Sequence, residues 1–125
     1  DMGCALPSSL GVASNDDRPV YCITGDGSFM SNLQDLSVLS YHNYNVKIIL
    51  LNNGGYMSIS NTQKNNYGNN IYGEHEGRGL HFPDYKTVCR AFGIKYIKVT
   101  NIEDLTLFRT DKGPILFGKR APTYW

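Results

Sequence analysis

The chain has 125 residues, 41% of them hydrophobic and 18% charged, which is enough apolar material for the core of one domain. Its net charge of +1 gives no reason to expect nucleic acid or an anionic membrane surface as a partner. Apolar runs such as Ile48 to Leu51 are far too short to cross a bilayer, and the first residues lack the pattern of a secretory leader.

The three cysteines, Cys4, Cys22 and Cys89, are too few and too scattered for a disulfide framework or a zinc site. We expect all three to be small buried hydrophobic side chains. Their odd number fits a reducing compartment, so the sequence predicts a cytoplasmic protein.

The first half of the chain alternates helical and strand patterns. Residues 4–14 are expected to form a short helix, and residues 20–24 a short apolar strand after a polar loop. Residues 28–41 are expected to form one helix, because Phe29, Leu33, Leu36 and Leu39 recur at helical spacing. Residues 46–51 are almost continuously apolar, which is typical of a strand buried on both faces of a parallel sheet.

The second half continues the alternation after a long interruption. Residues 65–81 are rich in Gly and Asn and have no period, which predicts a long loop. The other elements expected here are one or two helical turns at 56–62, helices at 83–92 and 101–109, and strands at 93–99 and 114–118. Strands that alternate with helices predict an α/β fold, a mostly parallel sheet with helices on both faces. Ligands of such sheets bind at the carboxyl ends of the strands.

Two unusual turns occupy such strand ends. Gly25-Asp26-Gly27-Ser28 follows the first strand, and Asn52-Asn53-Gly54-Gly55 follows the second. The strands and the helix between them make one unit of about thirty residues, which is the usual size of a parallel strand-helix-strand unit. The two turns are therefore expected side by side, with a carboxylate and two amides near one point.

These residue types suit a metal and a diphosphate. The first amides of a helix at Gly27 and Ser28 attract phosphate, and Gly27 has no side chain to keep a ligand away. Asp26 alone would repel a phosphate, but a divalent cation between the two removes the conflict. The Asp26 carboxylate, the Asn53 amide oxygen and a backbone carbonyl are the hard oxygen donors that Mg²⁺ prefers.

Three other interpretations compete with this one. A dinucleotide fingerprint needs a third glycine where the chain has Met30, and a Walker loop needs a lysine that does not follow Gly27. Two ordinary turns at strand ends are the plain alternative, but the pairing of both motifs on an α/β pattern disfavours it.

With these motifs the sequence resembles thiamine-diphosphate-dependent enzymes. Their signature is Gly-Asp-Gly followed, some 25 to 30 residues later, by Asn-Asn after an apolar run; here it reads "GDGSFMSNLQDLSVLSYHNYNVKIILLNNGGY". The opening "MGCALPSSLGVA" is similar to the acetolactate synthase and pyruvate oxidase branch. The resemblance implies that residues 1–125 are the diphosphate-binding domain of a larger multidomain chain, incomplete at both ends.

The resemblance also implies a role for each matching residue. Asp26 and Asn53 would bind Mg²⁺ through their side chains, and Gly55 through its backbone carbonyl. Thiamine diphosphate would be bound by four residues: Met2 under its rings, and Gly25, Gly27 and Ser28 around its diphosphate. The activating glutamate of the family lies on a different domain, so no catalytic residue is identified within this chain.

By the same resemblance the protein is an enzyme that decarboxylates or joins small 2-oxo acids, a lyase or a transferase. Its implied partner is a pyrimidine-binding domain, usually from a neighbouring subunit of a homodimer or homotetramer. The alternative is a non-catalytic module that binds the cofactor or pairs with a catalytic subunit.

Residues that approach the substrate are sought in the 65–81 loop, which carries His75, Arg78 and His81 and follows Lys64. Such loops are usually mobile until they are ordered by a ligand. Surface charges are the plain interpretation of all four residues.

Overall fold

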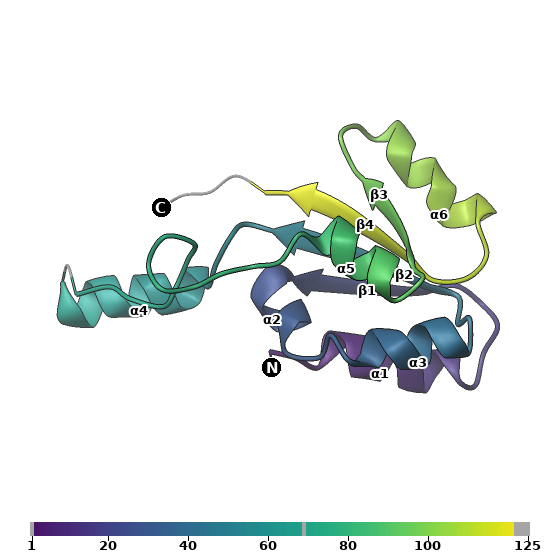
Figure 1. The fold of residues 1–125 in the computed structure, drawn as a ribbon, viewed down its shortest axis with the longest axis horizontal. Helices are drawn as coiled ribbons and strands as arrows, with labels where there is room; N and C mark the ends of the chain where they lie inside the picture. Colours follow the sequence, from purple (N-terminus) through teal and green to yellow (C-terminus); the bar gives the residue numbers. More distant parts are fainter. Residues whose placement is uncertain (1, 69, 122–125) are drawn as a thin grey trace.

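The computed structural model describes residues 2–68 and 70–121, and within them four strands form one sheet. Its spatial order is β1 (Val20–Gly25), β2 (Val46–Asn52), β4 (Ile115–Arg120) and β3 (Lys95–Lys98). All three neighbouring pairs are parallel (Figure 1). The predicted parallel α/β fold is therefore confirmed.

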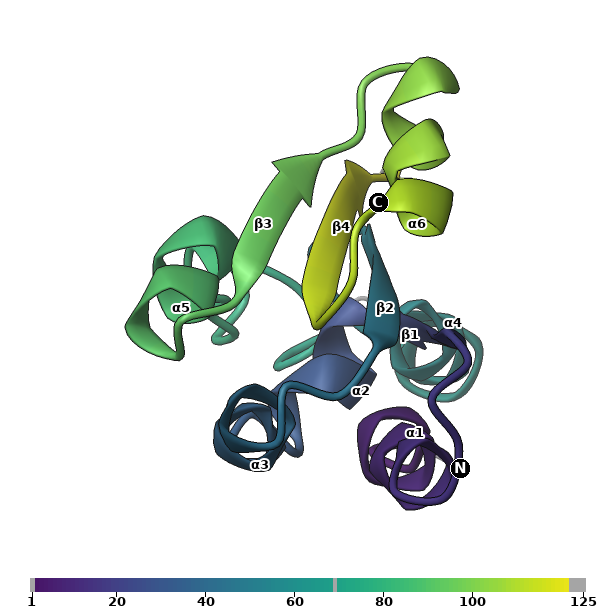
Figure 2. The same cartoon turned by 90° about the vertical axis from the view of Figure 1, so that its right-hand side faces the viewer.

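Helices lie on both faces of this sheet, but unequally. They are α1 (Ala5–Ala13), α2 (Asp26–Met30), α3 (Asp35–Tyr41), α4 (Met57–Tyr67), α5 (Tyr85–Ala91), the 3₁₀ helix η1 (Glu103–Thr106) and α6 (Leu107–Thr110). Figure 2 shows α1, α2, α3 and α5 on one side of the sheet and α6 on the other. Among the described residues, no helix has both the length and the apolar composition that crossing a bilayer requires.

The main core lies between the sheet and the four helices on one face. The register aligns Cys22 with Ile48 and Ile48 with Leu116, so these side chains share that face. The helices add buried apolar side chains to the same cluster: Leu6, Phe29, Leu36, Leu39 and Cys89. Burial raises the pKa of the Cys89 thiol to about 12, as suits a packing residue. Cys22 and Cys89 are buried as expected, but Cys4 is exposed, so that part of the cysteine prediction is wrong.

The opposite face of the sheet is only partly covered. Phe108 of α6 packs on Phe117 with ring centroids 3.9 Å apart, and edge-on against Tyr21 at 5.8 Å. Even with this contact Tyr21 is 50% exposed, and its neighbours on the same face, Ile23 and Leu51, are 62% and 44% exposed. An apolar strip along β1 and β2 therefore faces outward in this chain.

A lysine is buried on the part of this face that α6 and the segment after it cover. Lys47 of β2 is fully buried, and its Nζ donates to the carbonyl oxygens of Asp111 at 2.7 Å and Gly113 at 2.6 Å. Burial lowers the pKa of Lys47, while the nearby Asp111 charge opposes this shift. The side chain thus ties the end of α6 and the approach to β4 onto the middle of the sheet.

The helix expected over residues 28–41 is wrong in its outline, because two helices occupy the region. Between α2 and α3 the backbone makes tighter i→i+3 bonds, including Asn32 N–H to Phe29 O and Asp35 N–H to Asn32 O. The Asn32 side chain also donates to the carbonyl oxygen of Gly3, which draws the chain toward α1. Phe29, Leu36 and Leu39 are still buried, and Leu33 is partly buried against the same core, so the predicted apolar face is correct.

The loop expected from residue 65 begins later than predicted. Helix α4 extends to Tyr67, far beyond the one or two turns expected at 56–62. Its only buried residue is Ser60, and side chains return to its own backbone: Thr62 Oγ1 to Ser58 O at 2.9 Å and Asn66 Nδ2 to Thr62 O at 2.8 Å. A polar helix of this kind carries no apolar period for sequence analysis to detect.

Candidate functional site

The two motif turns meet at the carboxyl ends of β1 and β2, as the sequence predicts. Gly25 is aligned with Leu51 in the parallel register, and Asp26 begins α2 immediately after β1. The Gly54 amide donates to Asp26 Oδ2 at 2.6 Å, which joins the second turn directly to the first. The Gly27 amide donates to Asp26 Oδ1 at 2.8 Å. Both carboxylate oxygens of Asp26 are therefore held by backbone donors.

Asp26 is a buried acid at the centre of this junction. Its exposed fraction is 2%, and burial raises the pKa of its carboxyl, while the backbone amides around it, Gly27 and Gly54 foremost, oppose the rise. A buried carboxylate that is held only by neutral dipoles lacks a counter-charge. A cation placed beside it would favour the ionised form.

The second turn presents amide oxygens toward its own backbone. Asn52 Oδ1 accepts from the Gly54 amide at 3.0 Å, and Asn53 Oδ1 accepts from the Gly55 amide at 3.3 Å. An amide oxygen has two lone pairs, so one such bond does not by itself use all of its acceptor capacity. In residues 2–68 and 70–121 no three His, Cys, Asp or Glu side chains cluster as a metal site. Any metal here would rely on one carboxylate together with amide and backbone oxygens.

Gly27 and Ser28 lie close against other parts of the chain. A Cβ atom on Gly27 would come within 2.1 Å of the Tyr56 ring, so a glycine is required for this packing. The Ser28 hydroxyl oxygen accepts from the Gly3 amide at 2.9 Å, which joins α2 to the start of α1. The Ser28 O–H is thus oriented by an incoming bond and has its own proton to donate.

All seven residues that the sequence predicts to bind the metal or the cofactor line one cleft. Its volume is about 400 Å³, and it contains Met2, Gly25, Asp26, Gly27, Ser28, Asn53 and Gly55. Met2 is 56% exposed, so it lines the cleft and is not part of the core. A further four neighbouring residues of the wall were missed: Tyr56, Met57, Ser58 and Ile59. Only their position directly after the Asn-Asn-Gly-Gly turn could have indicated them.

The segment after α4 folds back over the second turn. The Tyr56 amide donates to Glu74 O at 2.6 Å, and the Glu76 amide donates to Gly54 O at 3.1 Å. Gly55 and His75 form an antiparallel bridge between these bonds. Asn69 lies outside the described residues. The rest of the expected loop therefore includes a segment paired to the candidate metal-binding turn.

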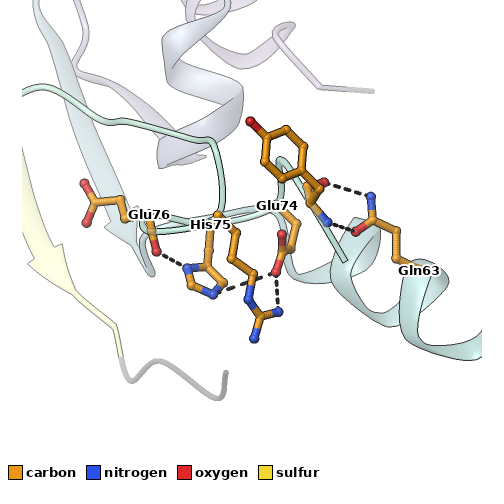
Figure 3. A network of polar contacts seen from close by, with 6 residues as sticks. Gln63, Glu74, His75 and Glu76 are labelled. Carbon is orange, nitrogen blue, oxygen red and sulfur yellow. Dashed lines mark hydrogen bonds and ion pairs between the residues drawn. The ribbon is translucent and has the colours of Figure 1, made fainter. Parts of the chain in front are cut away.

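The polar residues proposed to approach a substrate do not line the cleft, although His75 is paired with Gly55 at its wall. Lys64, His75, Arg78 and His81 are absent from the lining of the cleft in the part of the chain that the structure describes. Arg78 Nη1 donates to Glu74 Oε1 at 2.8 Å, and His75 Nε2 lies 3.7 Å from the same oxygen (Figure 3). Lys64 and His81 are exposed. Glu74, fully buried, is the member of this group that the sequence did not single out.

Comparison with known proteins supports the resemblance seen in the motifs. Residues 1–107 match the family model described as "Thiamine pyrophosphate enzyme, C-terminal TPP binding domain". The acetolactate synthase large subunit of Cyanidium caldarium is 31% identical over 105 residues, which are 83% of this chain and 18% of that protein. The isozyme 1 large subunit of Escherichia coli strain K12 is 32% identical over 104 residues, with 82% and 18% covered.

A solved structure shows the same fold. It is a thiamine diphosphate-dependent 4-hydroxybenzoylformate decarboxylase of Rhodococcus jostii RHA1, with a TM-score of 0.80 and 25% sequence identity. The match covers 98% of this chain and 23% of that one. The chain thus spans about a fifth of the length of the relatives it matches.

Proposed function

The chain belongs to the thiamine pyrophosphate enzyme family as its C-terminal TPP-binding domain, and we propose that it binds Mg²⁺ and the diphosphate of thiamine diphosphate within an acetolactate synthase-like enzyme. The observation that carries the proposal is the single cleft into which all seven motif residues converge. The substrate class that goes with this proposal is a small 2-oxo acid.

The donor set of the cleft fits Mg²⁺. Asp26, the Asn53 amide oxygen and the Gly55 carbonyl would bind the ion, and all three are hard oxygen donors. The bonds from Gly27 and Gly54 fix the Asp26 carboxylate beforehand, so little reorganisation accompanies binding. The charge of the cation would offset the burial that raises the pKa of Asp26.

The diphosphate would lie against Gly25, Gly27 and Ser28. Ser28 is among the first residues of α2, where amides have no partner inside the helix. Its hydroxyl, oriented by the Gly3 amide, supplies a second donor. The Gly27 amide already serves Asp26, so the contribution of Gly25 and Gly27 is close approach of the backbone.

Met2 would support the ring system of the cofactor. Its side chain is exposed at the cleft, and a flexible thioether adapts to an irregular apolar surface. When bound, thiamine diphosphate supplies an electron sink for the carbanion that remains after a 2-oxo acid loses CO₂. The residues of this chain hold and orient that group, and an activating glutamate is proposed on a second domain, contributed by a neighbouring subunit of a homodimer or homotetramer in the cytoplasm.

The second candidate is a module that binds the cofactor without catalysis. The stretch from Tyr56 to Lys64 contains no acid, although the wall of the cleft continues along it. A glutamate near the pyrimidine ring in another domain of the full-length protein supports the enzyme, and its absence supports the binding module.

The metal assignment is tested by Asp26→Ala and Asn53→Ala in the full-length protein. Each variant is expected to lose Mg²⁺-dependent binding of thiamine diphosphate in calorimetry while retaining the far-UV circular dichroism of the wild type. The reason is that each substitution removes one oxygen ligand of the proposed ion. Unchanged affinity for thiamine diphosphate in either variant would rule out that residue as a ligand.

A further inference from the structure

The segment 73–80, here named the 73–80 hairpin, is held together by hydrogen bonds between its own residues. The Gly73 amide donates to Arg78 O at 2.5 Å, and the Arg78 amide donates to His75 O at 3.1 Å. Its start is attached to α4, because Gln63 exchanges two side-chain bonds of 3.0 Å with the backbone of Tyr72 (Figure 3). The hairpin is thus a defined structure with its own hydrogen bonds.

The hairpin is packed against the residue proposed to give Mg²⁺ its backbone ligand. Bonds from the Tyr56 amide to Glu74 O and from the Glu76 amide to Gly54 O lie on either side of Gly55. A Cβ atom on Gly55 would come within 2.2 Å of Glu74 O and 2.7 Å of His75 Cβ. The orientation of the Gly54–Gly55–Tyr56 backbone is therefore set by contact with Glu74 and His75.

Glu74 anchors the hairpin through a buried carboxylate. The side chain is fully buried, and its Oε1 accepts from Arg78 Nη1 at 2.8 Å. Its Oε2 has no hydrogen-bond partner among the described residues. The Arg78 side chain is 42% exposed, so the pair joins a buried acid to a base at the surface. An ionised carboxylate in such a place depends strongly on the charged group that donates a hydrogen bond to it, which here is Arg78.

We propose that Glu74 and Arg78 are positioning residues for the metal site, because their ion pair holds the 73–80 hairpin on the Gly54–Tyr56 turn and so orients the Gly55 carbonyl. This inference rests on the proposed function. Without Arg78 the buried Glu74 carboxylate loses its counter-charge, and the hairpin opens to bring it to water. The Gly55 carbonyl then loses its support, and affinity for Mg²⁺ falls.

This role differs from the one that the sequence suggested for Arg78. There Arg78 was a candidate for contact with the substrate, with a surface charge as the plain interpretation. In the structure its guanidinium is paired with Glu74 and lies outside the lining of the cleft. The two roles predict different measurements. If Arg78 is a positioning residue, its removal lowers Mg²⁺ affinity and leaves the ranking of substrates unchanged. If Arg78 contacts the substrate, its removal raises KM for 2-oxo acids and leaves Mg²⁺ affinity unchanged.

The test measures Mg²⁺ affinity of the full-length protein at saturating thiamine diphosphate, by titration with MgCl₂ in calorimetry. Arg78→Ala is expected to weaken Mg²⁺ binding by about tenfold or more, as loss of a residue that supports a metal ligand usually does. Arg78→Lys should restore part of the loss, because it returns the charge. In a Glu74→Gln background, Arg78→Ala should have a much smaller effect, since no buried charge then needs pairing.

A control separates this effect from a general loss of positive charge. Arg90→Ala removes an exposed arginine of α5, which is outside the 73–80 hairpin. This variant should bind Mg²⁺ as the wild type does. Wild-type affinity in Arg78→Ala, or equal losses with and without Glu74→Gln, would overturn the positioning role alone. A wild-type protein that binds no thiamine diphosphate with Mg²⁺ would overturn the proposed function, and this inference with it.

Discussion

Gly27 has no side chain at a point where the Tyr56 ring lies directly against its α-carbon. From the sequence we expected this glycine to leave room for a ligand. The structure gives it a second reason, because the first motif turn and the residue after Gly55 are in van der Waals contact through it. One missing methyl group therefore allows the two turns to approach each other.

Gly27→Ala is expected to lower the free energy of unfolding by about 1–3 kcal/mol, the usual cost of inserting a methyl group into a filled space. Tyr56 must move to admit the new Cβ, so the cofactor cleft should also change shape. Urea unfolding of the wild type, Gly27→Ala, Tyr56→Ala and the double variant measures the coupling. If the two substitutions are additive, their contact is not the source of the loss.

Among the elements, β2 contains a fully buried lysine, Lys47, that has no buried acid beside it. Lys47 is paired instead with the carbonyls of Asp111 and Gly113, which lie in the segment between α6 and β4. The strand thereby fixes both the end of α6 and the start of its neighbour in the sheet. This bond reaches across 66 positions of sequence, so no local pattern indicates it.

Lys47→Met is expected to destabilise the fold by about 3 kcal/mol, because it leaves two inward carbonyl oxygens without a donor. Lys98→Met on β3 is the matched control, since that lysine is exposed and its loss should cost less than about 0.5 kcal/mol. Thermal and urea unfolding of both variants provide the comparison. Equal stability of the two variants would show that the buried bonds of Lys47 contribute little.

The sequence predicted those elements that have an apolar period and missed those held by polar contacts. Phe29, Leu36 and Leu39 indicated a buried helical face, and Ile48 and Leu50 indicated a buried strand. The break between α2 and α3 depends on the Asn32 bond to Gly3, which is distant in sequence. The extension of α4 depends on side chains that bond to their own helix, and such bonds leave no hydrophobic signature.

The candidate site was predictable to the same extent. Parallel strands bring their carboxyl ends together, so the meeting of Asp26 and the Asn-Asn turn follows from topology. The pairing of Glu74 with Arg78 was not predictable, because a loop has no period that places one side chain inward and another outward. Tyr56 was not predicted either, because its ring fills the space that a side chain on Gly27 would occupy, and this contact joins residues far apart in the sequence.

At the scale of the whole molecule, the cofactor cleft lies at one end of the sheet, and α4 projects beyond that end (Figure 1). Asp26 is the single carboxylate in the lining of the cleft, within the part of the chain described, and it is assigned to the metal. The proposed function therefore places the acid that activates the cofactor outside this domain, as the family resemblance implies.

Residues 1–125 alone are accordingly expected to release no CO₂ from pyruvate or another 2-oxo acid, even with thiamine diphosphate and Mg²⁺ added. The full-length protein under the same conditions is the positive control. Circular dichroism of the 125-residue chain shows whether it is folded during the assay. Sustained CO₂ release by the folded 125-residue chain would contradict the need for a second domain.

The 73–80 hairpin contacts the Gly54–Tyr56 turn through main-chain hydrogen bonds, from the Tyr56 amide to Glu74 O and from the Glu76 amide to Gly54 O. Main-chain groups are the same whatever side chain they carry, so this contact depends little on which side chains stand at the exposed positions of the hairpin. A random library at the exposed Glu76, with Gly55, Glu74, His75 and Arg78 held fixed, would therefore diversify the surface near the cleft while the protein still binds the cofactor.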